Sequence, residues 1–303
     1  MPWTTSDRMI DLRSKHPSIE IGVDTLDGWR RHISGRNASV VAFFGFVSIF
    51  PLLLAATTIL GFVLQDNEEL QQRIIDGALA DIPVLGQQLQ SDPASLNGSV
   101  WALVIGLAGA LWGATKAFAG LQAALDDVWE IDVDHRASLP VQRGRALLGI
   151  VIIGGAQIAS LALATLVNSA GLPNAGRFVL TAANVAVNIG VLGLMYRFLT
   201  AASPTWRDVL PGAITAGVLY TLLQHFGTDI TRRIIENSSD TYGQFAIVLG
   251  LITWLSLLAI ASIMSAELNA AIVRYRDGSL VSVQPPEQVA ESTTVANAAA
   301  PST

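Results

Sequence analysis

Six long apolar runs dominate this sequence, and they restrict what the chain can fold into more than any other feature. The first, VVAFFGFVSIFPLLLAATTILGFVL at residues 40–64, contains no charged residue. A helix needs about 20 apolar residues to cross the hydrocarbon core of a bilayer, which is roughly 30 Å thick. Runs of this kind lie at 40–64, 100–123, 146–168, 178–200, 209–228 and 245–273. The sequence therefore predicts an all-α, polytopic membrane protein with six transmembrane helices.

The composition agrees with this prediction. Only 14% of the residues are charged and 51% are hydrophobic, whereas soluble domains carry about 25% charged residues. The first run is too long for the core of a signal peptide, so we expect it to be retained as a membrane span. The chain contains no cysteine, which excludes disulfide bonds and thiol chemistry.

The distribution of charge predicts the orientation. Cations collect before the first span, whereas the connection at 65–99 carries six acidic residues and one arginine, Arg73. Cytoplasmic loops are enriched in lysine and arginine. We therefore expect cytoplasmic N- and C-termini. Arg232 and Arg233 oppose this assignment, because they fall in a connection that it places outside.

Three regions follow from these spans. Residues 1–39 form a cytoplasmic tail that ends in a predicted amphipathic juxtamembrane helix, in which Leu26, Trp29 and Ile33 recur at helical spacing. Residues 40–276 form the membrane domain, with an outer helical loop at 65–99. Residues 277–303 lack aromatic residues and periodicity, which is typical of a disordered tail.

Small residues four positions apart mark the expected helix contacts. Helices in lipid associate by close backbone approach, because burial of apolar surface gives them little advantage there. The pairs are Gly106 with Ala110, Gly109 with Gly113, Gly113 with Ala117, Gly212 with Ala216 and Ala213 with Gly217. We therefore expect the second and fifth spans to be central in the bundle.

Pro51 lies inside the first span and predicts a kink there. Proline lacks the backbone donor and displaces the carbonyl four residues earlier, that of Val47. In lipid this carbonyl needs another partner, and the hydroxyls of Ser48 and of Thr57 or Thr58 are candidates. The kink either opens a cavity on one side of the bundle or only improves helix packing.

Polar residues inside the spans are the candidate functional residues, because a charged or amide group at bilayer depth needs a partner or a wet space. The candidates for a substrate path are Lys116, Glu267, Asn184, Asn188, Gln157 and Gln224. Each has a structural alternative. The lysine can extend toward the inner surface, and the amides can join helices through hydrogen bonds. Glu267 can pair with Arg274 or Arg197, or across the bundle with Lys116.

Three segments resemble the YihY/BrkB family of bacterial inner-membrane proteins. They read FFGFVSIFPLLL, LWGATKAFAGLQAALDDVWEI and SSDTYGQFAIVLGLITWLSLLAIASIMSAELNAAI, and the similarity runs from about residue 24 to residue 277. The family's patterned positions fall on Ser48, Pro51, Lys116, Ala117, Phe118, Asp126, Trp129, Tyr242, Gly243, Glu267 and Asn269. One position departs from the pattern, because Ser265 stands where the family usually has glycine, which puts close packing of the sixth helix in doubt.

The resemblance implies a six-span inner-membrane protein linked to envelope integrity, with no settled biochemical activity. An older family label is ribonuclease, but the chemistry opposes it. Phosphodiester hydrolysis generally needs metal-binding side chains gathered at one site, and the histidines here are scattered at 16, 32, 135 and 225. No nucleotide-binding GxxxxGK[ST] loop is present either. We expect no enzyme activity, no cofactor, no metal and no nucleic-acid partner.

Two functions from different classes remain open. The first is a transporter or flippase that moves a lipid or another envelope component through a polar cavity in the bundle. The second is a membrane scaffold for envelope assembly that moves nothing, in which the polar residues only join helices. The expected partners are membrane lipids, with envelope-assembly proteins and a second copy of the chain as further alternatives.

Overall fold

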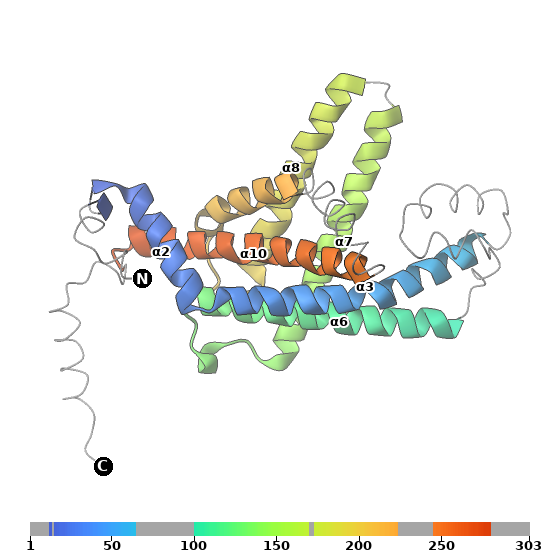
Figure 1. Cartoon of the computed structure of the whole chain (residues 1–303), viewed down its shortest axis with the longest axis horizontal. Coiled ribbons are helices and arrows are strands. Elements are labelled where there is room, and N and C mark those ends of the chain that lie inside the picture. The colour runs from blue at the N-terminus through green and yellow to red at the C-terminus, as the bar shows by residue number, and fades with distance from the viewer. Residues whose placement is uncertain (1–11, 14, 65–99, 170–172, 224–244, 280–303) are drawn as a thin grey trace, which may run out of the picture.

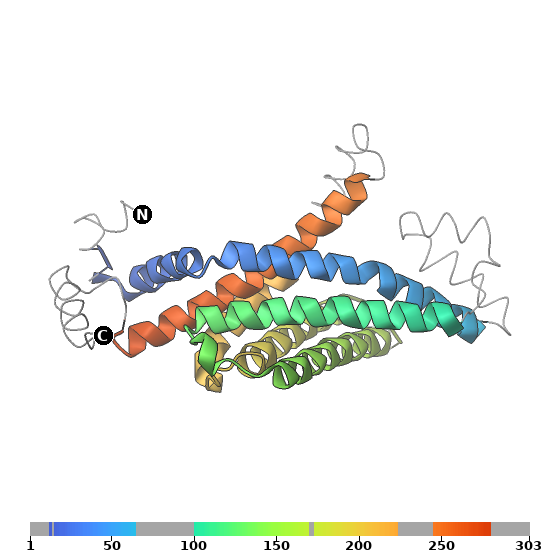
Figure 2. The same ribbon diagram turned by 90° about the horizontal axis from the view of Figure 1, so that it is seen from below.

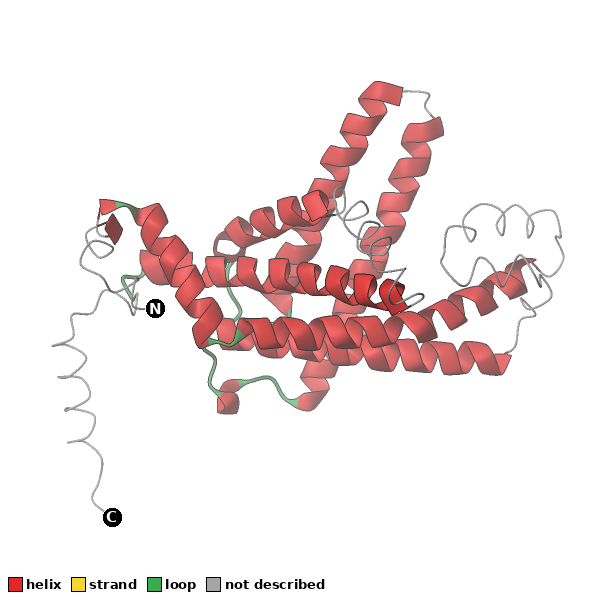
Figure 3. Cartoon of the chain, viewed as in Figure 1, coloured by secondary structure: helices red, strands yellow, loops and turns green. Residues whose placement is uncertain are grey.

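A computed structural model describes residues 12–13, 15–64, 100–169, 173–223 and 245–279, and these parts of the chain form helices and short connections (Figure 1 and Figure 3). The elements are α2 (Pro17–Arg31), α3 (Ser34–Leu64), α6 (Val100–Val128), the 3₁₀ turn η2 (Val133–His135), α7 (Leu139–Ser169), α8 (Pro173–Phe198), a helix over residues 206–223 and α10 (Phe245–Arg276). The predictions made for the outer loop at 65–99, for Gln224, Tyr242 and Gly243, and for the tail after residue 279 lie outside the described residues.

Four of these helices are long and apolar enough to cross a membrane: Ser34–Ala56, Val100–Val128, Phe178–Phe198 and Val248–Arg276. Large apolar side chains such as Phe50, Trp101 and Phe178 are more than half exposed on them, as expected for surfaces that face lipid. The third and fifth predicted spans fall on α7 and on the helix over residues 206–223. The all-helical membrane architecture is therefore confirmed, and the number of six crossings stays a prediction.

α3 and α6 run antiparallel side by side over most of their length (Figure 1 and Figure 2). Their contact is made by glycines of α6, as the spacing of small residues predicted. A Cβ added to Gly106 would lie 2.8 Å from the backbone nitrogen of Ala55, and one added to Gly113 would lie 2.8 Å from Cβ of Ser48. Only glycine permits this approach of the two backbones.

Pro51 sits on this contact, and α3 bends partway along its length (Figure 1 and Figure 2). A Cβ added to Gly109 would lie 2.9 Å from Cβ of Pro51, so the proline ring packs against α6. The hydroxyl of Ser48 donates to the Gly45 carbonyl at 2.7 Å. The prediction that the Ser48 hydroxyl donates a hydrogen bond to the Val47 carbonyl is therefore wrong.

Thr58 was the other described candidate for the Val47 carbonyl. Its hydroxyl donates to the carbonyl of Leu54 at 2.7 Å, one turn back in α3. This prediction is wrong as well, because each hydroxyl bonds to a carbonyl three or four residues earlier in its own helix. The side chain of Thr57 lies outside the described residues.

The helix over residues 206–223 is central, as predicted. Ala213 and Ala216 are fully buried, Gly217 contacts Ile189 of α8, and Gly212 contacts the Ser265 carbonyl of α10. The expectation that Ser265 disturbs close packing is therefore wrong: its side chain is 1% exposed, and the backbone carbonyl, not the hydroxyl, meets Gly212.

The most deeply buried apolar side chains lie where α6, α8 and α10 end and the helix over residues 206–223 begins. Leu125, Val128, Leu199, Val209 and Ile263 have no exposed surface. The first turns of α3 and the whole of α2 pack near this end of the bundle (Figure 1). This end therefore holds the most deeply buried part of the apolar core.

Candidate functional site

A sharp elbow joins α2 to α3 and begins the site. The predicted juxtamembrane helix is present as α2, but it ends at Arg31, and His32 and Ile33 separate it from the start of α3 at Ser34. Between them, Ile33 has a positive φ of 52° and an exposed fraction of 51%. A β-branched residue in the left-handed region is strained, so its neighbours must hold the elbow in place.

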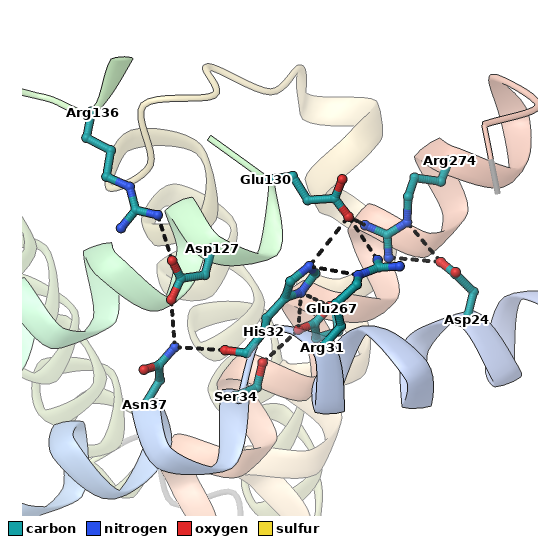
Figure 4. A network of polar contacts seen from close by, with 10 residues as sticks. All are labelled: Asp24, Arg31, His32, Ser34, Asn37, Asp127, Glu130, Arg136, Glu267 and Arg274. Carbon is teal, nitrogen blue, oxygen red and sulfur yellow. Dashed lines mark hydrogen bonds and ion pairs between the residues drawn. The ribbon is translucent and has the colours of Figure 1, made fainter. Parts of the chain in front are cut away.

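Glu267 of α10 provides that hold (Figure 4). Its side chain has no exposed surface. Nδ1 of His32 lies 2.9 Å from one carboxylate oxygen and 3.2 Å from the other, and the hydroxyl of Ser34 donates at 2.7 Å. A Cβ added to Gly28 would lie 2.5 Å from the carboxylate. The backbone of α2 therefore lies directly over Glu267.

Glu130 forms the second centre of this polar network (Figure 4). It follows the end of α6 and has a positive φ of 54°. One of its oxygens lies 2.8 Å from Nη2 of Arg31, 3.5 Å from Nε2 of His32 and 3.7 Å from Nη1 of Arg274. Two residues with positive φ thus belong to this region: Ile33 lies beside the network of charged side chains, and Glu130 is part of it.

Arg274 extends the network back to α2. Its Nε donates to Asp24 at 2.9 Å, and the Asp24 side chain is 1% exposed. The prediction that Glu267 pairs with Arg274 is replaced by this arrangement, in which Arg274 binds two other carboxylates. Arg197 does not form an ion pair with Glu267 either. Its guanidinium packs over the Trp206 ring, 5.0 Å from the ring centre.

Two further buried polar residues at the family's patterned positions join chain segments. Asp126 accepts hydrogen bonds from the Thr200 hydroxyl and the Ala201 backbone, both at 2.8 Å. Asn269 accepts from the backbone of Gly212 at 2.6 Å and donates to the carbonyl of Val209 at 3.1 Å. These side chains satisfy backbone groups near helix ends that would otherwise be left without partners.

A separate cavity of about 410 Å³ lies among α3, α6, α7, α8, the helix over residues 206–223 and α10. Apolar side chains such as Val41, Phe118 and Leu258 form most of its wall, and among the described residues no charged side chain lines it. Phe118, at a patterned position of the family, is 8% exposed. The cavity therefore offers an apolar surface at the level of the membrane spans.

Three polar side chains reach the wall of this cavity: Asn188, Tyr220 and Ser262. The Tyr220 hydroxyl lies 2.7 Å from the Ser262 hydroxyl, and Asn188 donates to Thr221 at 3.3 Å. Asn188 thus has both predicted roles, because it joins α8 to the next helix and also lines the cavity.

The other predicted path residues do not gather at one place. Lys116 is exposed on α6 and does not line the cavity, whereas Ala117 beside it does. The predicted pair of Lys116 with Glu267 is therefore not formed. Asn184 is exposed on α8. Gln157 lies on α7 with its side chain outside the described residues.

Sequence reasoning missed the residues that complete the polar network. His32, Ser34 and Asn37 were assigned to a tail and its juxtamembrane helix, yet they contact residues about 90 to 235 positions away. Asn37 donates to Asp127, which also pairs with Arg136 at 2.7 Å. The clustering of His32, Ser34 and Asn37 at the start of the first span was the sequence signal that could have indicated a buried polar contact there. Among the described residues, no group of three histidine or acidic side chains is placed to hold a metal ion.

Comparison with known proteins agrees with the helical membrane architecture. The sequence matches the family model described as Virulence factor BrkB over residues 25–289. It is also similar to the UPF0761 membrane proteins of Stenotrophomonas maltophilia strains K279a and R551-3, with 26% identity over 134 residues in each case. These alignments cover 42% of this chain and 31% of each relative, so the chain matches about a third of the relatives' length. No solved structure matches.

The family match covers most of the described helices, including α3, α6 and α10 with their buried polar residues. The long apolar helices indicate a multi-pass membrane location. The chain belongs to the BrkB virulence factor family of membrane proteins.

Proposed function

We propose that this protein is an inner-membrane transporter or flippase for a lipid or another envelope component, and that its role supports envelope integrity. The cavity among the membrane helices carries the proposal. Its volume of about 410 Å³ falls within the roughly 300–1,000 Å³ of ligand pockets. Its wall is formed by helices whose outer surfaces are apolar, so the nearest abundant ligand is membrane lipid.

The chemistry of the cavity wall defines which part of a lipid enters. An apolar wall suits a hydrocarbon chain, and burying a charge there without a partner costs several kcal/mol. Asn188, Tyr220 and Ser262 provide one uncharged polar spot. We therefore propose that the cavity holds the chain and a neutral polar group of the cargo, while a charged headgroup stays outside. This differs from the polar cavity expected from the sequence.

Reconstitution into liposomes tests this function. Purified protein is incorporated with fluorescent lipid analogues, and a membrane-impermeant reagent bleaches the outer leaflet. Bleaching of more than half of the fluorescence, at a rate that rises with protein content, is the expected result. A bleached fraction no larger than in protein-free vesicles opposes movement of these lipids.

A matched pair of variants connects the activity to the cavity. Ala117→Trp places a large side chain in the wall of the cavity, and Ala108→Trp places the same side chain on an exposed position of α6. We expect the first variant to lose at least tenfold in rate and the second to keep the original rate. Equal rates in the two variants would mean that the cavity is not the route.

A scaffold for envelope assembly is the second candidate, and one observation favours it. Glu267, Asp126 and Asn269 are bonded to neighbouring segments and have at most 4% exposed surface, as residues that only join helices would be. In that case envelope-assembly proteins or a second copy of the chain are the partners. Cross-linking in intact cells that captures one such protein, together with no lipid movement in liposomes, is the outcome that supports this alternative.

A further inference from the structure

We propose that His32 is a proton-binding switch that holds the α2–α3 elbow on the membrane domain. The switch goes beyond the transport proposal, because it concerns how α2 is held and is independent of the cargo. Its observations are the buried Glu267, the two ring nitrogens of His32 that face different carboxylates, and the strained backbone of Ile33. The ligand of this site is a proton.

One ring nitrogen of His32 has a fixed role. Nδ1 lies 2.9 and 3.2 Å from the two oxygens of Glu267. In the proposed switch Glu267 is ionised and only accepts hydrogen bonds, so Nδ1 carries the hydrogen that this contact needs. This contact, together with the Ser34 hydroxyl at 2.7 Å, satisfies a carboxyl group that has no exposed surface.

The other ring nitrogen has two alternative partners (Figure 4). Nε2 lies 3.4 Å from Nε of Arg31, which donates to it, and 3.5 Å from an oxygen of Glu130. A neutral ring uses Nε2 as the acceptor for Arg31, whereas a protonated ring donates from Nε2 to Glu130. The proton is therefore gained and lost at Nε2. The Glu130 side chain is 48% exposed and connects this atom to water.

Charge balance determines which state holds α2 more tightly. The groups that face His32 or its partners are Asp24 and Arg31 from α2, Glu130 after α6, and Glu267 and Arg274 from α10. These are three carboxylates and two guanidinium groups. A protonated His32 makes three cations against three anions, whereas a neutral His32 leaves a network with two buried carboxylates, Asp24 and Glu267, one negative charge in excess.

The elbow converts this charge change into movement. Loss of the proton weakens the contacts of His32, and the strain at Ile33 then favours release of α2 from α10. α3 begins at the next residue, and its residues Val41, Ala42 and Gly45 line the membrane cavity. A change in the elbow is thus transmitted along a continuous helix to the cavity wall.

Spin labelling of the complete chain in lipid nanodiscs tests the switch. The chain has no native cysteine, so Gly22→Cys on α2 gives one label at a position where a Cβ meets no atom within 4 Å. Spectra recorded from about pH 5 to pH 9 bracket the ordinary titration range of histidine. We expect low mobility at acidic pH and a rise in mobility with one midpoint as the pH increases.

Three variants in the labelled background identify the group responsible. His32→Gln should remove the pH dependence, and Glu130→Gln should move the midpoint to lower pH, because it removes the anion that favours the protonated ring. His135→Gln is the control, since this histidine is 80% exposed, and it should leave the midpoint unchanged. A spectrum that does not change with pH, a midpoint that persists in His32→Gln, or an unchanged midpoint in Glu130→Gln would overturn the proposal. Because the Glu130 side chain is half exposed, we expect Glu130→Gln to fold. It therefore tests the switch even where His32→Gln fails to fold.

Discussion

Single polar side chains in this protein act on backbone groups that lie far away in the sequence. Asp126 binds the chain that leaves α8, at Thr200 and Ala201, and Asn269 binds the first turns of the next helix through Val209 and Gly212. A buried backbone group without a partner costs about 1–3 kcal/mol. At the scale of the residue, the patterned polar positions thus stabilise the fold at the ends of helices.

The strained elbow gives the first prediction. Ile33→Gly should raise the free energy of unfolding by about 0.5–1 kcal/mol, because relief of roughly 1–2 kcal/mol of left-handed strain exceeds the added entropy of the unfolded chain. Ile19→Gly, at an exposed position inside α2, should lower it by about 0.5 kcal/mol. Denaturant titration in detergent micelles measures both. The same sign in the two variants would show that the backbone at Ile33 is not strained.

At the scale of the element, the α3–α6 contact depends on the absence of side chains. Gly106→Ala should lower the free energy of unfolding by about 1–3 kcal/mol, because the new Cβ would meet backbone atoms at 2.8 Å and backbone cannot move aside as a flexible side chain does. Gly190→Ala in α8 is the control, since no atom lies within 4 Å of its added Cβ, and it should be neutral or raise stability by up to about 1 kcal/mol. The difference between the two variants in thermal unfolding checks this prediction.

The start of the helix over residues 206–223 gives a pH-dependent prediction. Asp208 accepts from the Thr205 backbone at 2.9 Å, which is one half of a capping box, and from the Thr205 hydroxyl at 2.6 Å. It also pairs with Arg276 at 2.9 Å. Burial opposes ionisation, but the hydrogen bonds from Thr205 and the charge of Arg276 outweigh it and lower the pKa of Asp208.

Because the folded-state pKa is lowered, this contribution to stability is present above the ordinary pKa of 3.8 and is lost as the pH falls toward the folded value. Asp208→Asn should therefore be less stable than the original protein near neutral pH, and the difference should shrink below about pH 4. Unfolding curves at both pH values measure the difference. A constant difference would mean that the charge of Asp208 does not contribute.

At the scale of the whole molecule, α2 and the end of α10 lie at the same end of the bundle. Asp24 and Arg274 join them at 2.9 Å, although the two residues are 250 positions apart. This contact requires both helix ends to lie on the same side of the membrane. The excess of arginine before the first span predicts that this side is the cytoplasm.

Cysteine labelling tests that orientation in the cysteine-free chain. Ser18→Cys and Ser279→Cys both lie at exposed positions. An impermeant maleimide should label both in inside-out membrane vesicles and neither in right-side-out vesicles. Labelling of both in right-side-out vesicles would reverse the orientation, and labelling of one in each would contradict the contact between Asp24 and Arg274.

The amino-acid sequence by itself determined the features that depend on local periodicity. Apolar runs of span length located the helices of the membrane domain, and glycines four positions apart located the face of α6 that makes a close helix contact. These predictions succeed because helix formation and close backbone approach depend on neighbouring residues within one element.

Only the tertiary structure decided which polar groups meet. Glu267 was expected to pair with Lys116 or with an arginine, and it binds His32 and Ser34 from the other end of the chain. Lys116 faces outward, and the cavity between the helices is lined by uncharged side chains. The physical reason is that periodicity places a residue on a face of its own helix, whereas the partner of that face depends on the rotation and tilt of helices far away in the sequence.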